Sequence, residues 1–96
     1  MQTIPIQPVP SQKLRVQLSD QDCVINVYQR STGVYLDLQV DGRVIVMGSL
    51  CRDRVKIVRQ EYLGFKGDIA FMDTSGKEDP AYAGFGGRFL LVYLES

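Results

Sequence analysis

Few residues in this 96-residue sequence have the chemistry for catalysis. The sequence contains no histidine, which removes the most common general base and the most common metal ligand. Two carboxylate pairs have suitable groups for acid–base catalysis, but nothing ties either pair to a nucleophile or a cleft. These pairs are Asp37 with Asp41 and Glu78 with Asp79. The glycine-rich stretch Gly84–Gly87 lacks the Lys-Ser/Thr pair of a phosphate-binding loop. We therefore expect no enzymatic activity and no cofactor.

The sequence has two cysteines, Cys23 and Cys51. Two thiols without a histidine cannot complete a zinc site, and small secreted scaffolds usually carry more cysteines than this. We expect two reduced thiols on or near β-strands, with a single disulfide or a reactive thiol as the alternative. The segment Met1–Pro10 has neither the basic nor the apolar region of a signal peptide. Apolar runs are also too short to span a membrane, so a cytosol-like compartment is expected.

A local basic run consists of Arg52, Arg54, Lys56 and Arg59. The first three alternate with other residues, so in a β-strand they would share one face. Three interpretations are open: a solvated face partly neutralised by Asp53 and Glu61, a contact with an acidic protein, or a contact with phosphate. Lys plus Arg number 11 and Asp plus Glu number 11, so the formal net charge is zero. Nucleic-acid modules usually carry a positive excess, which makes nucleic acid the least favoured partner.

Aromatic residues lie beside glycines in two segments, Tyr62–Phe65 and Tyr82–Phe85. These rings either fill the ends of a core or act as exposed anchors at a subunit interface, where aromatic residues dominate the contacts. The sequence does not separate the two interpretations. The complete set of interface candidates, including the basic run and the N-terminal apolar residues, is Ile4, Ile6, Val9, Tyr35, Arg52, Arg54, Lys56, Tyr62, Phe65, Tyr82 and Phe85.

The elements that must position these residues are β-strands, because apolar residues recur with a period of two from residue 12 onward. The predicted strands are Leu14–Leu18, Cys23–Tyr28, Val34–Val40, Arg43–Leu50, Asp68–Asp73 and Phe89–Leu94, with a short strand or loose turn within Arg52–Glu61. The dipeptide Asp41-Gly42 predicts a tight hairpin, and Gly48 a bulge. Asp37 faces the polar side of its strand and could pair with an arginine across the sheet.

The segment from Met1 to Pro10 contains Pro5, Pro8 and Pro10, which predicts an extended arm or an edge strand. Ile4 and Ile6 alternate in this arm, so it should lie against its own sheet or a neighbouring subunit. The segment Thr74–Gly87 is rich in glycine and charge and predicts an exposed loop. The sequence as a whole predicts one all-β domain over residues 1–96, an antiparallel barrel or sandwich of about seven short strands.

The order of these pieces resembles a known family, the small baseplate plug proteins of contractile-tailed phages. The resemblance covers nearly the whole chain and is carried by Gly33–Leu38, Asp41-Gly42, Gly48–Leu50, Tyr62–Gly64 with Gly67, and Leu91–Leu94. Members of this family open with an apolar, proline-containing arm and end with an apolar strand. Val34 stands where the family usually has tryptophan, and the basic run is more charged than is typical of the family.

The resemblance implies an all-β structural protein of the virion, located in the tail baseplate after assembly in the host cytoplasm. It implies contacts with other copies around the tail axis, with threefold or sixfold symmetry, and with hub, spike or tube proteins. Packing and strand addition at the arm and the strand edges would make these contacts. The alternative function is a small nucleic-acid-binding barrel, OB-like or Sm-like, which would need surface aromatics beside the basic run.

Overall fold

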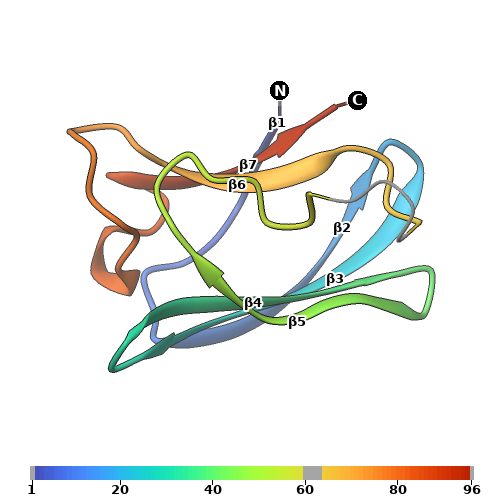
Figure 1. Cartoon of the computed structure of the whole chain (residues 1–96), viewed down its shortest axis with the longest axis horizontal. Helices are drawn as coiled ribbons and strands as arrows, with labels where there is room; N and C mark the ends of the chain where they lie inside the picture. The colour runs from blue at the N-terminus through green and yellow to red at the C-terminus, as the bar shows by residue number, and fades with distance from the viewer. Residues whose placement is uncertain (1, 60–63, 96) are drawn as a thin grey trace.

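Two antiparallel sheets pack against each other in this computed structural model, which describes residues 2–59 and 64–95 (Figure 1). The larger sheet contains, in spatial order, β2 (Ser11–Leu18), β3 (Gln21–Arg30), β4 (Gly33–Val40) and β5 (Arg43–Cys51). The smaller sheet contains β1 (Gln2–Ile4), β7 (Phe89–Leu94) and β6 (Asp68–Asp73). A 3-10 turn, η2 (Tyr82–Gly84), lies between β6 and β7. The all-β prediction is confirmed, and the architecture is a sandwich rather than a closed barrel.

Tight turns set the register of the larger sheet. Asp41 and Gly42 have φ values of 50° and 82°, so both central positions of this turn lie in the left-handed region, as a type I′ hairpin requires. Ser19 and Asp20, in the turn between β2 and β3, also have left-handed φ values, of 51° and 63°. The two turns lie at the same end of the sheet, and the backbone N–H of Asp41 donates to the carbonyl of Asp22 at 2.9 Å. The predicted hairpin is confirmed.

The core lies between the two sheets and is built from the alternate residues of each strand. Ile25, Leu36 and Leu38 of the larger sheet are fully buried, as are Ile69 and Leu91 of the smaller sheet. Alternation in the sequence therefore translates directly into an inner and an outer face. The last strand departs from alternation because its consecutive residues Leu91, Val92 and Tyr93 are all buried.

Both cysteines lie in this core as free thiols, Cys23 on β3 and Cys51 on β5. Burial raises the pKa of Cys23 to about 11 and that of Cys51 to about 12, because the thiolate would lose its hydration. Both side chains therefore stay protonated at neutral pH and behave as small apolar groups. This confirms the prediction of reduced, strand-borne cysteines.

The N-terminal arm forms part of the chain's own fold. Residues Gln2–Ile4 pair with β7, where Ile4 lies opposite Leu91, and the following residues lead across to the larger sheet (Figure 1). Ile4 and Ile6 are 1% and 5% exposed. The prediction that their side chains face a neighbour is therefore wrong, because the core between the two sheets already covers them. Val9, at 39% exposure, is the large apolar side chain of the arm that faces solvent.

Candidate interaction surfaces

The structure divides the predicted interface residues into buried and exposed groups. Phe65 and Phe85 are 2% and 4% exposed and belong to the core, like the two isoleucines of the arm. Phe65 packs edge-on against Tyr93 with ring centroids 5.8 Å apart, and Phe85 stacks on Phe71 at 5.4 Å. The prediction that these two phenylalanines are exposed anchors is therefore wrong. Their glycine neighbours make tight turns that fold each ring inward.

The remaining described candidates face solvent at least in part. Tyr82 is 38% exposed on η2, and Tyr35 is half-buried on the outer face of β4. Arg52, Arg54 and Lys56 are exposed after the end of β5. Tyr62 lies outside the described residues. The exposed side chains, together with Val9, stay predicted contact residues.

The basic run does not form the strand that would place its cations on one face. Turns and bends replace a regular strand over residues 54–59, and Arg54 and Arg59 have positive φ values of 58° and 64°. The carboxylate of Asp68 explains the bend. It accepts hydrogen bonds from three consecutive backbone N–H groups, those of Ile57 at 3.1 Å, Val58 at 2.9 Å and Arg59 at 2.7 Å. The shared-face prediction is corrected accordingly.

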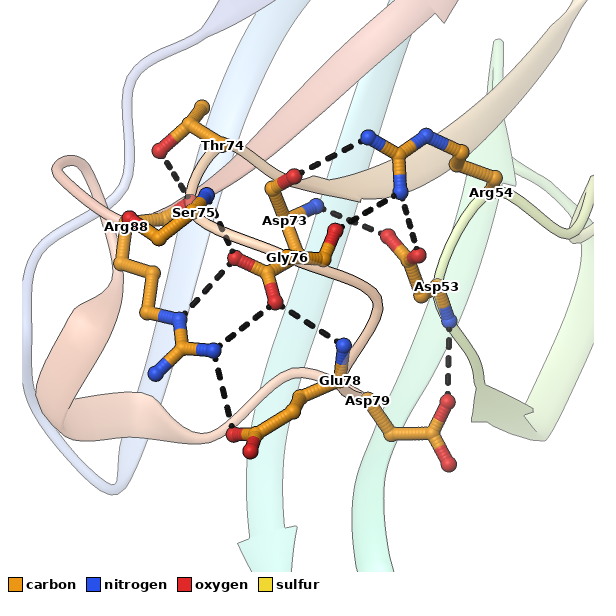
Figure 2. A network of polar contacts seen from close by, with 9 residues as sticks. All are labelled: Asp53, Arg54, Asp73, Thr74, Ser75, Gly76, Glu78, Asp79 and Arg88. Atoms are coloured by element: carbon orange, nitrogen blue, oxygen red, sulfur yellow. Dashed lines mark hydrogen bonds and ion pairs between the residues drawn. The ribbon is translucent and has the colours of Figure 1, made fainter.

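The guanidinium of Arg54 remains partly exposed but is bonded to the protein (Figure 2). It contacts the carboxylate of Asp53 at 2.6 Å and donates to the carbonyls of Asp73 and Gly76, each at 3.1 Å. Asp53 in turn accepts the backbone N–H of Asp73 at 2.8 Å through its other oxygen. One member of the basic run thus ties the segment after β5 to the end of β6, and its charge is largely used within the fold.

Asp73 is the centre of this polar network, as Figure 2 shows. Its fully covered carboxylate accepts two hydrogen bonds from Arg88, from Nε at 2.9 Å and from Nη2 at 3.0 Å. It also accepts the backbone N–H groups of Ser75 and Glu78, both at 2.9 Å. The Arg88 guanidinium, aided by these N–H groups, holds the pKa of Asp73 well below its ordinary 3.8. The carboxylate therefore stays ionised throughout the neutral and mildly acidic range.

The network fixes the long loop between β6 and β7. Thr74 closes the base of the loop, because its N–H and its hydroxyl both donate to the carbonyl of Arg88 at 2.8 Å. On the other side, the carboxylate of Asp79 accepts the N–H of Asp53 at 3.1 Å. The loop is exposed, as predicted, but it is pinned to the sandwich from both sides. Sequence reasoning missed Asp73 because Arg88, the cation that pairs with it, lies 15 residues further along the chain. The available clue was a carboxylate at the end of an otherwise apolar strand.

Asp37 also acts differently from its prediction. It faces the outer side of β4, but it accepts the hydroxyl of Tyr28 at 3.0 Å and the backbone N–H of Gly48 at 2.7 Å rather than an arginine. Gly48 has a φ of 65° and lies where the β4–β5 register shifts, which is the predicted bulge. The bulge turns its N–H toward the carboxylate, so the sheet itself supplies the partner.

Among residues 2–59 and 64–95, no cluster of three or more His, Cys, Asp or Glu side chains is arranged to hold a metal ion. Asp37, Asp73 and Asp79 each accept hydrogen bonds that shape a turn or a loop. Within the described part of the chain, no helix is long and apolar enough to cross a membrane. What the fold offers chemically is a set of shaped surfaces.

A comparison with protein families decides which class of assembly uses these surfaces. A family model described as cyanophage baseplate Pam3 plug gp18 matches residues 1–96. The chain belongs to this family. A search of curated proteins gives no match. The resemblance inferred from the sequence is confirmed, and with it the location in the virion tail baseplate.

As a baseplate plug, the chain is a structural component of a phage tail. The features found above suit that class, since the plug's charged residues serve the loops and turns that shape its surface. The fold belongs to an all-β structural protein, as expected from the sequence. No observation favours the small nucleic-acid-binding barrel that was considered as an alternative.

The plug is expected not to bind DNA with useful affinity. Its formal net charge is zero, and Arg54 of the basic run is already engaged within the fold. A filter-binding titration of the full chain at low salt, with single- and double-stranded DNA, should show no binding tighter than about 10⁻⁴ M. Tight binding that weakens steeply with salt and is lost in Lys56→Glu would contradict this expectation.

Proposed function

We propose that the plug acts as a preformed, rigid packing element at the junction of the tail tube and the central spike. In this proposal several copies lie around the tail axis and contact hub, spike or tube proteins, and no reaction is catalysed. The observation that carries the proposal is the family match over residues 1–96, which places the chain in the baseplate. The absence of histidine from the sequence supports a purely structural role.

The mode of docking differs from the strand exchange considered from the sequence. The arm is already paired with β7, and its two isoleucines are buried in the chain's own core. Moving the arm to a neighbour would expose those side chains and unpair the edge of the smaller sheet. The plug therefore docks through its folded surfaces, and its neighbours need not complete its fold. Such a unit associates with little conformational ordering, which reduces the cost of binding.

The test is to count the plug in assembled baseplates. A phage lacking the plug gene would be complemented with the wild-type chain, and purified baseplates would be examined by quantitative mass spectrometry and by cryo-electron microscopy. We expect several copies per baseplate, at positions related by threefold or sixfold symmetry near the tube–spike junction. A single copy, or purified baseplates that contain none, would contradict the proposal.

A further inference from the structure

The outer face of β5 carries an unusual row of exposed apolar side chains. Val44, Met47 and Leu50 are 55%, 67% and 37% exposed. In a regular strand Met47 would face the side opposite to Val44 and Leu50, since side chains alternate. Register shifts against β4 lie between Ser49 and Val46 and between Val46 and Val44, so Met47 is exposed like its two neighbours, which lie opposite Tyr35 and Gln39. Bulges in the strand thus gather three apolar side chains on the solvent side.

The same bulges make the edge of β5 a poor template for a further strand. An added strand needs a regular row of free N–H and C=O groups, and a bulge interrupts that row. Near the second shift, the N–H of Gly48 is already bonded to Asp37 at 2.7 Å. The apolar row is therefore suited to contact through its side chains, across the face of the sheet, and not to sheet extension.

Two tyrosines continue this face toward the centre of the sheet. Tyr35 lies opposite Tyr28 on the neighbouring strand, and their rings stack with centroids 6.0 Å apart. Asp37 holds the hydroxyl of Tyr28 at 3.0 Å, and the hydroxyls of Tyr35 and Thr32 are hydrogen-bonded at 2.6 Å. The aromatic centre of the face is consequently fixed before any partner arrives, which favours tight contact.

The opposite margin of this face is basic. Lys13 and Arg15 on β2 lie opposite Asn26 and Val24 of β3, on the outer side of the sheet. Arg30, at the end of β3, lies over the ring of Tyr28 at 5.1 Å from its centroid. Within the described residues, none of these three cations takes part in an ion pair. The face therefore presents three cations on one side and apolar side chains on the other.

A hollow of about 550 Å³ lies between the two margins. Its lining residues include Ser11, Asn26, Tyr28, Arg30 and Asp37. The floor is polar, and Arg30 is the cation that lines it. A carboxylate inserted there would meet the Arg30 guanidinium, which binds carboxylates through paired hydrogen bonds, while the Asp37 carboxylate of the lining already accepts hydrogen bonds from Tyr28 and Gly48. The hollow gives the outer face a shape that a projecting acidic side chain can enter.

We propose that this outer face, made of β2, β3, β4 and β5, is the docking surface for a different baseplate protein. The partner segment carries carboxylates that lie over Lys13, Arg15 and Arg30, and apolar side chains that lie over Met47 and its neighbours on β5. The inference rests on the proposed function and names the surface through which the plug is held. Lys13 and Arg15 on β2 are separated from the apolar row on β5 by three strand spacings of about 4.8 Å. The partner's carboxylates over β2 and its apolar groups over β5 therefore lie about 14 Å apart.

A second copy of the chain fits this face poorly. Two such faces laid fully over each other would bring Lys13 and Arg15 of one copy against the cations or the apolar row of the other, which is unfavourable. Pairing through the β5 row alone would use Val44, Met47 and Leu50. These side chains cover far less than the roughly 800 Å² per partner of a stable interface. The three cations therefore select an acidic partner of another kind.

Nucleic acid also fits poorly, despite the nearby cations and aromatic rings. Single-stranded bases bind by stacking on open aromatic faces. Here Tyr28 and Tyr35 stack on each other, and Arg30 lies over the ring of Tyr28. The rings are thus engaged with each other and with a guanidinium. The exposed row on β5 is aliphatic and offers bases no stacking platform.

The experiment compares two variants of the face with two matched controls. Arg15→Glu and Met47→Asp change the basic and the apolar margin, and both positions are exposed. Lys77→Glu and Val55→Asp make the same kinds of change at exposed positions outside this face, in the β6–β7 loop and beyond the end of β5. All four are expected to melt within a few degrees of wild type by circular dichroism. Each is then supplied to baseplates that lack the plug, and incorporation is measured.

We expect each face variant to incorporate at least ten-fold less than wild type, and both controls to incorporate normally. Equal incorporation of the face variants and wild type would overturn the inference while leaving the proposed function intact. Failure of the wild-type chain itself to incorporate would instead contradict the proposed function. Light scattering on the purified chain, which measures its oligomeric state, provides a further test. A discrete dimer that Met47→Asp dissociates would overturn the inference in favour of a second copy, and DNA binding that Arg15→Glu abolishes would overturn it in favour of nucleic acid.

Discussion

Replacing Gly67 by alanine is expected to lower the melting temperature by about 15 °C, the largest effect of any single-methyl change in the chain. Gly67 has a φ of 95°, a conformation that strains any side chain. An added Cβ would also lie 2.6 Å from the carbonyl oxygen of Leu94 and 2.7 Å from the hydroxyl of Tyr93. That hydroxyl is fixed by Ser19 and Lys66. Backbone strain and overpacking together should cost about 3 kcal/mol.

Two other glycines separate the contributions to this loss. Gly42 has a φ of 82° with open space around its Cβ position, so Gly42→Ala should cost about 1 kcal/mol from backbone strain alone. Gly87 also has open space and no positive φ, so Gly87→Ala should change stability by less than about 0.5 kcal/mol. Thermal unfolding of the three variants measures the series. Equal losses at Gly67 and Gly42 would show that the neighbours of Gly67 move aside.

Replacing Asp73 by asparagine is expected to lower the melting temperature by on the order of 10 °C. The amide keeps the shape of the carboxylate, but one of its two ends becomes a donor. Each carboxylate oxygen accepts one N–H from Arg88 and one backbone N–H, from Ser75 or Glu78. Whichever way the amide turns, two donors would face its NH₂ group. A buried polar site that loses its acceptor is strongly destabilised.

Glu78→Gln provides the matched control for this change. Glu78 contacts the same guanidinium at 3.2 Å, but its side chain is 72% exposed, so little stability should be lost. The pH dependence gives a second measurement. The pKa of Asp73 in the folded protein lies below its ordinary value of 3.8. The carboxylate therefore contributes fully to the free energy of unfolding above about pH 3.8, and this contribution declines as the pH falls below that value. The difference in free energy of unfolding between wild type and Asp73→Asn should therefore stay constant from neutral pH to about pH 5 and become smaller in stronger acid. A difference that is unchanged below pH 3 would contradict the role of the ionised carboxylate.

The strands were predictable from the sequence because their determinants are local. The alternation at Val34–Val40 and the turn at Asp41-Gly42 act within a few residues, and the structure has both. The predicted interface residues depended on contacts between distant segments. Tyr82 and Phe85 belong to one short aromatic segment around Gly84, yet Phe85 meets Phe71 in the core and Tyr82 faces solvent. No local pattern distinguishes such a pair.

The basic run also depends on contacts that its local sequence does not reveal. Its alternation predicted cations on one face of a strand, but Asp68 bends the chain by accepting three backbone N–H groups, and Arg54 forms an ion pair with Asp53. The apolar row on β5 escaped notice for a related reason. Val44, Met47 and Leu50 share a face through register shifts that a period-two reading cannot reveal. Gly48 predicts a bulge at this point of the strand. The sequence does not show which neighbouring side chains such a bulge turns toward solvent.

The pairing of β1 with β7 also sets an order of events during folding. Gln2 lies opposite Tyr93, so β1 joins its sheet only after segments far apart in the sequence have met (Figure 1). The meander of β2 to β5 consists of sequence neighbours and is expected to collapse earlier, since local contacts form fastest. The inner side of the meander stays open to solvent until the smaller sheet covers it. The smaller sheet is thus the closing layer of the sandwich, and its pairing of β1 with β7 is expected among the last contacts to form.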